Sequence, residues 1–133
     1  MTLVGMFDSP YVRRVAISMR LLDLPFEHLS WSIGKDQDRV KELNPLGQVP
    51  ILVLDDGEVL VESATILDYL DDRVGPDRAL VPRSGDARRR TLGATPLAVG
   101  MADKARLPMD GRPFRPAPRP HPPLAARPPA AVP

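Results

Sequence analysis

Three short groups of residues in this chain have side chains and spacings that could act together. Ser9-Pro10 places a hydroxyl at the start of a helix, Val49-Pro50 opens a strand, and Glu62-Ser63 places an acid and a hydroxyl at the start of a later helix. Helix N-termini attract anions, and a strand that opens at a proline can pair its backbone with an extended peptide. Together the three groups indicate a site that binds a small thiol peptide through its backbone, its ammonium group and its sulfur.

The first of these groups is positioned by a strand, a tight turn and a helix. Residues 2–7 form an apolar run that ends at Asp8-Ser9-Pro10, which predicts a buried strand leading directly into a helix. Ser9 is a favourable N-cap, and Pro10 fits the first helical position because its missing amide hydrogen costs nothing there. Leu24-Pro25 ends this helix, and residues 26–31 predict a second strand parallel to the first.

The second and third groups are positioned by a hairpin. Residues 34–43 predict a short helix that Asn44-Pro45 stops. Residues 49–54 and 59–61 then flank Asp55-Asp56-Gly57, and aspartate and glycine tolerate the positive φ that such turns need. These segments therefore predict two antiparallel strands.

A last helix is predicted over residues 63–74, with apolar residues on one face. Its other face carries three acids, which we expect to be solvated rather than a metal site: Asp68, Asp71 and Asp72. The resulting order, βαβαββα, predicts an α/β fold with helices packed on a small mixed sheet. We assign residues 1–79 to this domain.

The remainder of the chain predicts little folded structure. Residues 80–106 are expected to be a linker and one rudimentary helix, which Pro96 should break at Thr95. Residues 107–133 hold ten of the 17 prolines and few large apolar side chains, so they cannot offset the entropy of ordering. We expect a disordered tail rich in proline and arginine.

Composition excludes several classes of function. The net charge of +1 gives no strong field for nucleic acid or a membrane. The chain has no cysteine, so any sulfur chemistry must come from a ligand, and we expect no metal. No apolar run approaches the roughly 18 residues of a membrane span, and the start of the chain lacks the pattern of a signal peptide. We therefore expect a cytoplasmic protein.

Three motifs, in this order and spacing, resemble the N-terminal domain of glutathione transferases. They are Ser9 to Val15 (SPYVRRV), Asn44 to Leu52 (NPLGQVPIL) and Glu62 to Leu70 (ESATILDYL). The chain looks most like bacterial members with serine at the first helix. The resemblance implies a thioredoxin-like fold with a cis bond before Pro50. It also implies glutathione as co-substrate without another cofactor, an electrophilic small molecule as the second substrate, and a homodimer.

Ser9 is the candidate catalytic residue that this resemblance implies. Its simpler interpretation is a plain N-cap, and Tyr11 is a weaker candidate because it lies two residues further into the helix. As a catalytic group, the Ser9 hydroxyl would donate to the sulfur of glutathione while the helix N-terminus adds partial positive charge. Lowering the thiol pKa by about two units needs only ~2.7 kcal/mol of differential interaction.

The other candidate residues would bind the glutathione backbone and its charged ends. A cis bond at Pro50 would turn the amide and carbonyl of Val49 outward to pair with the peptide, whereas a trans proline at a sheet edge is the commoner arrangement. Glu62 suits the ammonium group, and Ser63 with the helix amides suits the γ-glutamyl carboxylate, although the two could equally be a capping pair.

Two further polar residues and two aromatic ring residues are less informative. By analogy with related enzymes, Lys41 and Gln48 are candidate partners of the glycyl carboxylate. His28 and Trp31 have no partners at catalytic spacing, so His28 is interpreted as a strand or surface residue and Trp31 as a packing aromatic.

Family members carry a second, all-helical domain that supplies most of the electrophile pocket. Here that domain is nearly absent from the sequence, and the composition that replaces it is also what a frameshift in a GC-rich gene would produce. Two functions therefore remain open. One is a transferase in which Ser9 activates glutathione; the other is a non-catalytic remnant that binds glutathione or a protein. The absence of cysteine disfavours a redox enzyme.

Overall fold

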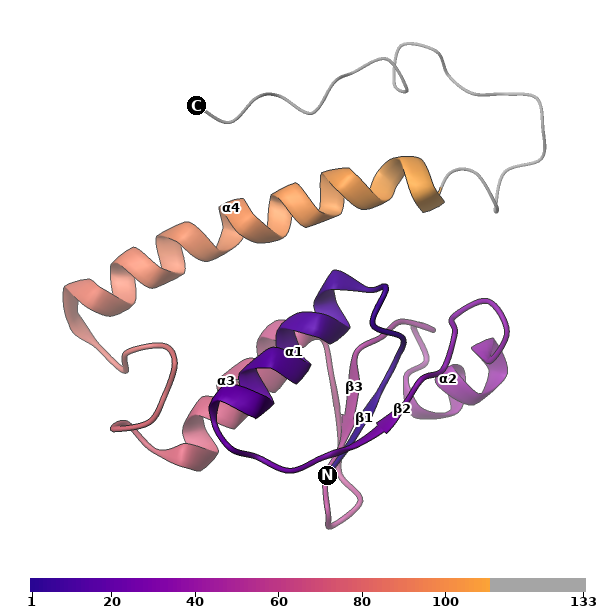
Figure 1. The fold of residues 1–133 in the computed structure, drawn as a ribbon, viewed down its shortest axis with the longest axis horizontal. Coiled ribbons are helices and arrows are strands. Elements are labelled where there is room, and N and C mark those ends of the chain that lie inside the picture. Colours follow the sequence, from indigo (N-terminus) through magenta and orange to yellow (C-terminus); the bar gives the residue numbers. More distant parts are fainter. Residues whose placement is uncertain (111–133) are drawn as a thin grey trace. The chain divides into compact units, whose positions relative to one another are not determined.

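The computed structural model describes residues 1–110, with side chains through Ala105, and confirms the predicted order of elements (Figure 1). Residues Met1–Gly85 form one compact unit, and α4 belongs to a second. The elements are β1 (Thr2–Val4), α1 (Pro10–Leu21), β2 (Glu27–Leu29), α2 (Gln37–Leu43), β3 (Ile51–Val53), β4 (Val59–Val61), α3 (Ser63–Val74) and α4 (Gly85–Asp110).

The four strands form one mixed sheet in the order β2-β1-β3-β4. β1 pairs with β2 in parallel, as predicted, and the other two pairs are antiparallel. Each strand has three residues, so three of the predicted strands are shorter than expected. β1 ends early because Gly5 turns the chain with a φ of 127°, and β3 starts late because Pro50 has no amide hydrogen for the ladder.

Helices cover both faces of this sheet, with α1 and α3 on one face and α2 on the other (Figure 1). Successive strand residues point to opposite faces, so Leu3 packs with α1 and α3 while Val4 packs with Val40 of α2. The larger core lies between the sheet and the first pair of helices. Its buried members are Leu3, Val12, Val15, Ala16, Met19, Leu22, Leu52, Leu54, Ile66 and Leu70.

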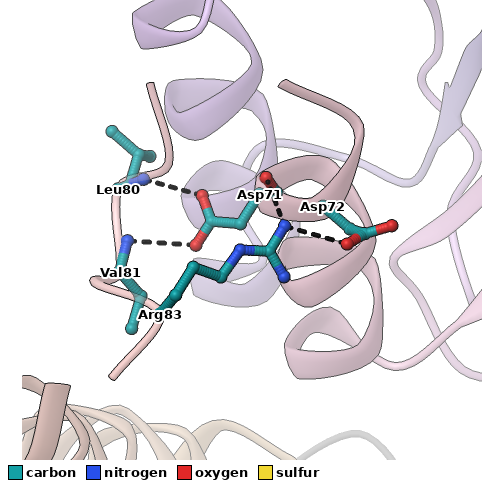
Figure 2. A network of polar contacts seen from close by, with 5 residues as sticks. All are labelled: Asp71, Asp72, Leu80, Val81 and Arg83. Atoms are coloured by element: carbon teal, nitrogen blue, oxygen red, sulfur yellow. Dashed lines mark hydrogen bonds and ion pairs between the residues drawn. The ribbon is translucent and has the colours of Figure 1, made fainter. Parts of the chain in front are cut away.

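Asp71 is buried, which corrects the prediction that all three acids of this helix are solvated. It is only 7% exposed, and its two carboxylate oxygens accept hydrogen bonds from the Leu80 amide at 2.7 Å and the Val81 amide at 3.0 Å (Figure 2). Arg83 donates from Nη2 to the Asp71 carbonyl at 3.3 Å and to the carboxylate of exposed Asp72 at 2.8 Å. The start of the predicted linker is therefore attached to α3.

The segment that follows α3 also contacts the C-terminal end of α1. The Arg78 guanidinium donates to the Leu22 carbonyl, just beyond the last residue of that helix. Helix C-termini leave carbonyls without intrahelical partners, and arginine side chains commonly bind them. Residues 78–83 thus connect the ends of both helices on this face of the sheet.

Helix α4 continues through Pro96, so the predicted break at Thr95 is wrong. The helix has 26 residues and extends to Asp110, four residues into the segment expected to be a tail; residues 111–133 lie outside the described part. In the turn before the proline, the Thr95 hydroxyl donates to the Thr91 carbonyl at 2.8 Å, a side-chain bond back to the preceding turn of the helix. Within residues 1–110, no helix is both long and apolar enough to cross a membrane.

Substitution Asp71→Asn should destabilise the chain by about 1–3 kcal/mol. An asparagine has one acceptor oxygen, so its amide group would face one of the two backbone N–H donors and leave that donor unpaired. The measurement is denaturant unfolding, together with proteolysis in the segment between Gly75 and Ser84, which should become faster.

Asp68→Asn is the matched control because Asp68 is an exposed acid on the same helix. It should change the free energy of unfolding by less than about 0.5 kcal/mol. Equal losses in both variants would show that the bonds to Leu80 and Val81 do not stabilise the fold.

Candidate functional site

The sheet register brings the three predicted groups to one end of the sheet. Val4 at the end of β1 lies opposite Ile51 at the start of β3, and Ile51 lies opposite Val61 at the end of β4. Ser9 follows the first of these strands, Pro50 precedes the second, and Glu62 follows the third. Helices α1 and α3 therefore both begin at this end of the sheet, and both lie on the same face of it.

Ser9 is the N-cap of α1, as predicted. It is half-buried, and its Oγ accepts a hydrogen bond of 3.4 Å from the Val12 amide. This bond uses a lone pair of the hydroxyl and leaves the hydroxyl hydrogen available, since serine is both donor and acceptor. The capping role and donation to a ligand sulfur are therefore compatible.

The peptide bond between Val49 and Pro50 is cis, as the family resemblance implied. Val49 lies two residues before β3, and its side chain packs against both core clusters. A Cβ built on Gly5 would lie 2.6 Å from Val12 Cγ2 and 2.8 Å from Val49 Cβ. Val49 and Val12, in the first turn of α1, thus both pack against Gly5, where there is no room for a side chain.

Glu62 and Ser63 form the capping pair that the sequence left as an alternative. The Glu62 carboxylate accepts from the Ala64 amide at 2.9 Å and from the hydroxyl of buried Ser63 at 3.1 Å. Glu62 has φ 71° and ψ 130°, a conformation that costs a residue with a side chain about 1–3 kcal/mol. Its carboxylate is nevertheless exposed, so it can also accept from a ligand ammonium group.

Gln48 and Lys41 lie by a loop that Asn44 organises. Asn44 is 3% exposed, and its side chain donates to the Gln48 carbonyl at 2.8 Å and accepts from the Leu46 amide at 3.1 Å. Gln48 and Lys41 are themselves exposed, and the stem of Lys41 passes close to Gly47. The structural role of Asn44 had a signal in the sequence, an asparagine directly before a proline.

His28 contacts the turn that carries Ser9, which the sequence did not predict. Its Nε2 lies 2.7 Å from the Gly5 carbonyl oxygen, and its ring stacks on Phe7 with centroids 4.0 Å apart. Trp31 packs beside β1 and β3, as predicted, and also lies under the Arg39 guanidinium at 4.6 Å.

A pocket of about 560 Å³ lies at the opposite end of the sheet and contains no predicted site residue. Its lining includes Thr2 and Glu27, which pair at the first positions of β1 and β2. The Met1 ammonium group donates to Asp55 here and lowers the pKa of that carboxyl, with a smaller effect of Arg73 in the same direction. Ser9, Val49-Pro50 and Glu62-Ser63 therefore lie away from this pocket.

The family model for the N-terminal domain of glutathione S-transferase matches residues 3–78. The chain belongs to the glutathione S-transferase family. Over 104 residues it is 34% identical to the uncharacterized GST-like protein YibF of Escherichia coli strain K12, a match that covers 77% of this chain and 50% of that protein.

Solved structures of members of this family share the fold. One from Methylobacterium radiotolerans, in complex with glutathione sulfonate, matches with a TM-score of 0.81 and 31% identity over 93% of this chain and 58% of that chain. A family member from Pseudomonas fluorescens Pf-5 with bound glutathione matches with a TM-score of 0.66 and 39% identity over 80% of this chain and 53% of that chain. The chain thus spans about half the length of these relatives.

Substitution Gly5→Ala should destabilise this chain by about 2–4 kcal/mol. The new methyl group would overlap Val12 and Val49, and the φ of 127° is unfavourable for alanine. Denaturant unfolding measures the loss.

Gly57→Ala is the matched control, because Gly57 also has a positive φ, of 92°, but no atom lies within 4 Å of the position that its new methyl group would take. It should cost about 1 kcal/mol, from backbone conformation alone. Similar losses at the two positions would contradict the close contact of Val49 with α1.

Proposed function

We propose that this chain binds glutathione at the end of the sheet where Ser9, Val49-Pro50 and Glu62-Ser63 meet, and that it acts as a glutathione transferase. The observation that supports the proposal is the register of Val4, Ile51 and Val61. Because these residues pair, the hydroxyl at the N-terminus of α1, the cis proline and the N-terminus of α3 lie at the same end of the sheet. Relatives with this fold bind glutathione or glutathione sulfonate.

Each candidate residue takes a part of glutathione that suits its chemistry. The backbone of Val49 pairs with the extended peptide, Glu62 accepts from the γ-glutamyl ammonium group, and the N-terminus of α3 with Ser63 binds the adjacent carboxylate. Gln48 and Lys41 bind the glycyl carboxylate at the exposed corner beside the Asn44 loop.

Ser9 activates the sulfur. The thiol proton leaves to water, and the Ser9 hydroxyl donates to the thiolate that remains while the partial positive charge of α1 stabilises it. The thiolate then supplies the electron pair for a carbon–sulfur bond, and the electrophile's leaving group departs with its own pair. This step needs no metal, redox cofactor or protein cysteine.

A second candidate function rests on the binding half of the site alone. A non-catalytic protein that binds glutathione or another protein could use the backbone of Val49 and the polar groups of Glu62 and Ser63 without activation of a thiol by Ser9. We propose a cytoplasmic location and a role in detoxification for the transferase, and homodimers of the kind common in the family.

Substitution Ser9→Ala should raise the pKa of the bound glutathione thiol by about one to two units and lower thioether formation with an aromatic electrophile by about tenfold or more. The loss of the donor removes a contact that is stronger with thiolate than with thiol. Ultraviolet absorbance of the bound thiolate, followed against pH, gives the pKa, and calorimetry gives the affinity.

Ser9→Asp separates capping from activation. Aspartate caps helices as well as serine does, but its charge repels a thiolate, so this variant should keep the thermal stability and still raise the thiol pKa. Unchanged thioether formation in Ser9→Ala would overturn the assignment of Ser9. A wild-type chain that binds glutathione but forms no thioether would favour the non-catalytic function.

Substitution Glu62→Gln should weaken glutathione binding about tenfold, because glutamine keeps a capping oxygen but loses the charge that faces the ligand ammonium group. Isothermal titration calorimetry measures the affinity. Glu58→Gln is the control, an exposed acid in the turn region of the hairpin, and should leave the affinity unchanged. Equal affinities of all three proteins would remove Glu62 from the site.

A further inference from the structure

We infer that His28 is a positioning residue, which holds the turn of residues 5–9 so that the Ser9 hydroxyl faces the sulfur of glutathione. The inference rests on the proposed function and extends it to a residue outside the three motifs. His28 lies in the middle of β2, and its side chain crosses to the turn that follows the neighbouring strand β1.

The first contact is a hydrogen bond to the backbone. A carbonyl oxygen can only accept, so His28 Nε2 carries the hydrogen and donates to Gly5 at 2.7 Å. The Gly5 amide donates to the Leu29 carbonyl at 2.9 Å. Consecutive residues of β2 therefore bind both backbone polar groups of the glycine at which the chain leaves the sheet.

The second contact is a ring stack. The His28 and Phe7 rings lie 4.0 Å apart with an angle of 10° between their planes, although Phe7 is 41% exposed. Arg13 of α1 donates to the Phe7 carbonyl at 2.8 Å. Phe7 is therefore contacted by β2 through its ring and by α1 through its backbone. One histidine thus binds two of the four residues that precede Ser9.

These contacts determine where Ser9 lies relative to the peptide-binding backbone. Gly5 is packed against Val12 of the Ser9 helix and against Val49 before the cis bond. A shift of the Gly5 carbonyl would therefore move the helix N-terminus relative to Val49. Small displacements of a reacting group are costly because transition-state contacts depend steeply on distance.

The His28 ring is half-buried, and its hydrogen bond and its ring stack are both made with the turn of residues 5–9. Loss of the ring should consequently change the site more than it changes the stability of the domain.

The test compares His28→Phe with His28→Gln in the full chain. Phenylalanine keeps a ring for Phe7 but cannot donate, whereas glutamine places a donor nitrogen where Nε2 lies but has no ring. His28→Phe should raise the pKa of the bound glutathione thiol by at least about half a unit, with affinity for glutathione within about twofold of wild type. His28→Gln should restore most of the thiol pKa.

The rise of the thiol pKa in His28→Phe should also depend on the presence of Ser9. In a Ser9→Ala background, His28→Phe should cause no further rise of the thiol pKa, because the donor that it positions is already absent. Glu27→Gln, an exposed change in the same strand, is the control and should behave as wild type. If His28→Phe unfolds, Phe7→Ala tests the stack alone and should give a smaller rise.

The outcomes separate this inference from the proposed function. An unchanged thiol pKa in His28→Phe, or a full additional rise in the Ser9→Ala background, would overturn the role of His28 and leave the proposed function in place. A wild-type chain that binds no glutathione would overturn both.

Discussion

The cross-strand register of Val4, Ile51 and Val61 is the constraint on which the candidate site depends. The strands are so short that their ends, rather than their middles, determine what the sheet presents to a ligand. A one-residue slip would move the core side chains to the other face and would also separate the start of α1 from the cis bond and the start of α3. The same ladder therefore specifies the core and the site.

Both helix N-termini at this end of the sheet are capped by side chains that can also bind a ligand. Ser9 uses a lone pair for its helix and keeps its hydrogen, and Glu62 uses its carboxylate while remaining exposed. Capping stabilises the helices and orders these side chains, so if they bind glutathione as proposed, less ordering cost remains to be met on binding. In the proposed function, stability and glutathione binding thus depend on the same few polar atoms.

The segment after α3 shows how a domain can extend past its last regular element. Asp71 binds two amides of this segment, and Arg78 returns to the end of α1. These are polar contacts at helix ends, where unpaired backbone groups must find partners. They explain why residues up to Gly85 belong to the first compact unit.

The order of elements, the two helix caps and the hairpin could all be predicted from the sequence, because each depends on local rules for glycine, proline and capping residues within a few positions. The cis bond before Pro50 was implied only by the family resemblance, since local rules also allow a trans proline there. Only the tertiary structure decided that Asp71 is buried and that His28 reaches Gly5. Burial and partner choice depend on segments that return from far along the chain, and hydrophobic periodicity within one helix or strand contains no information about them. The sequence therefore determined which residues could do chemistry, whereas the packing of distant segments determined how they are held.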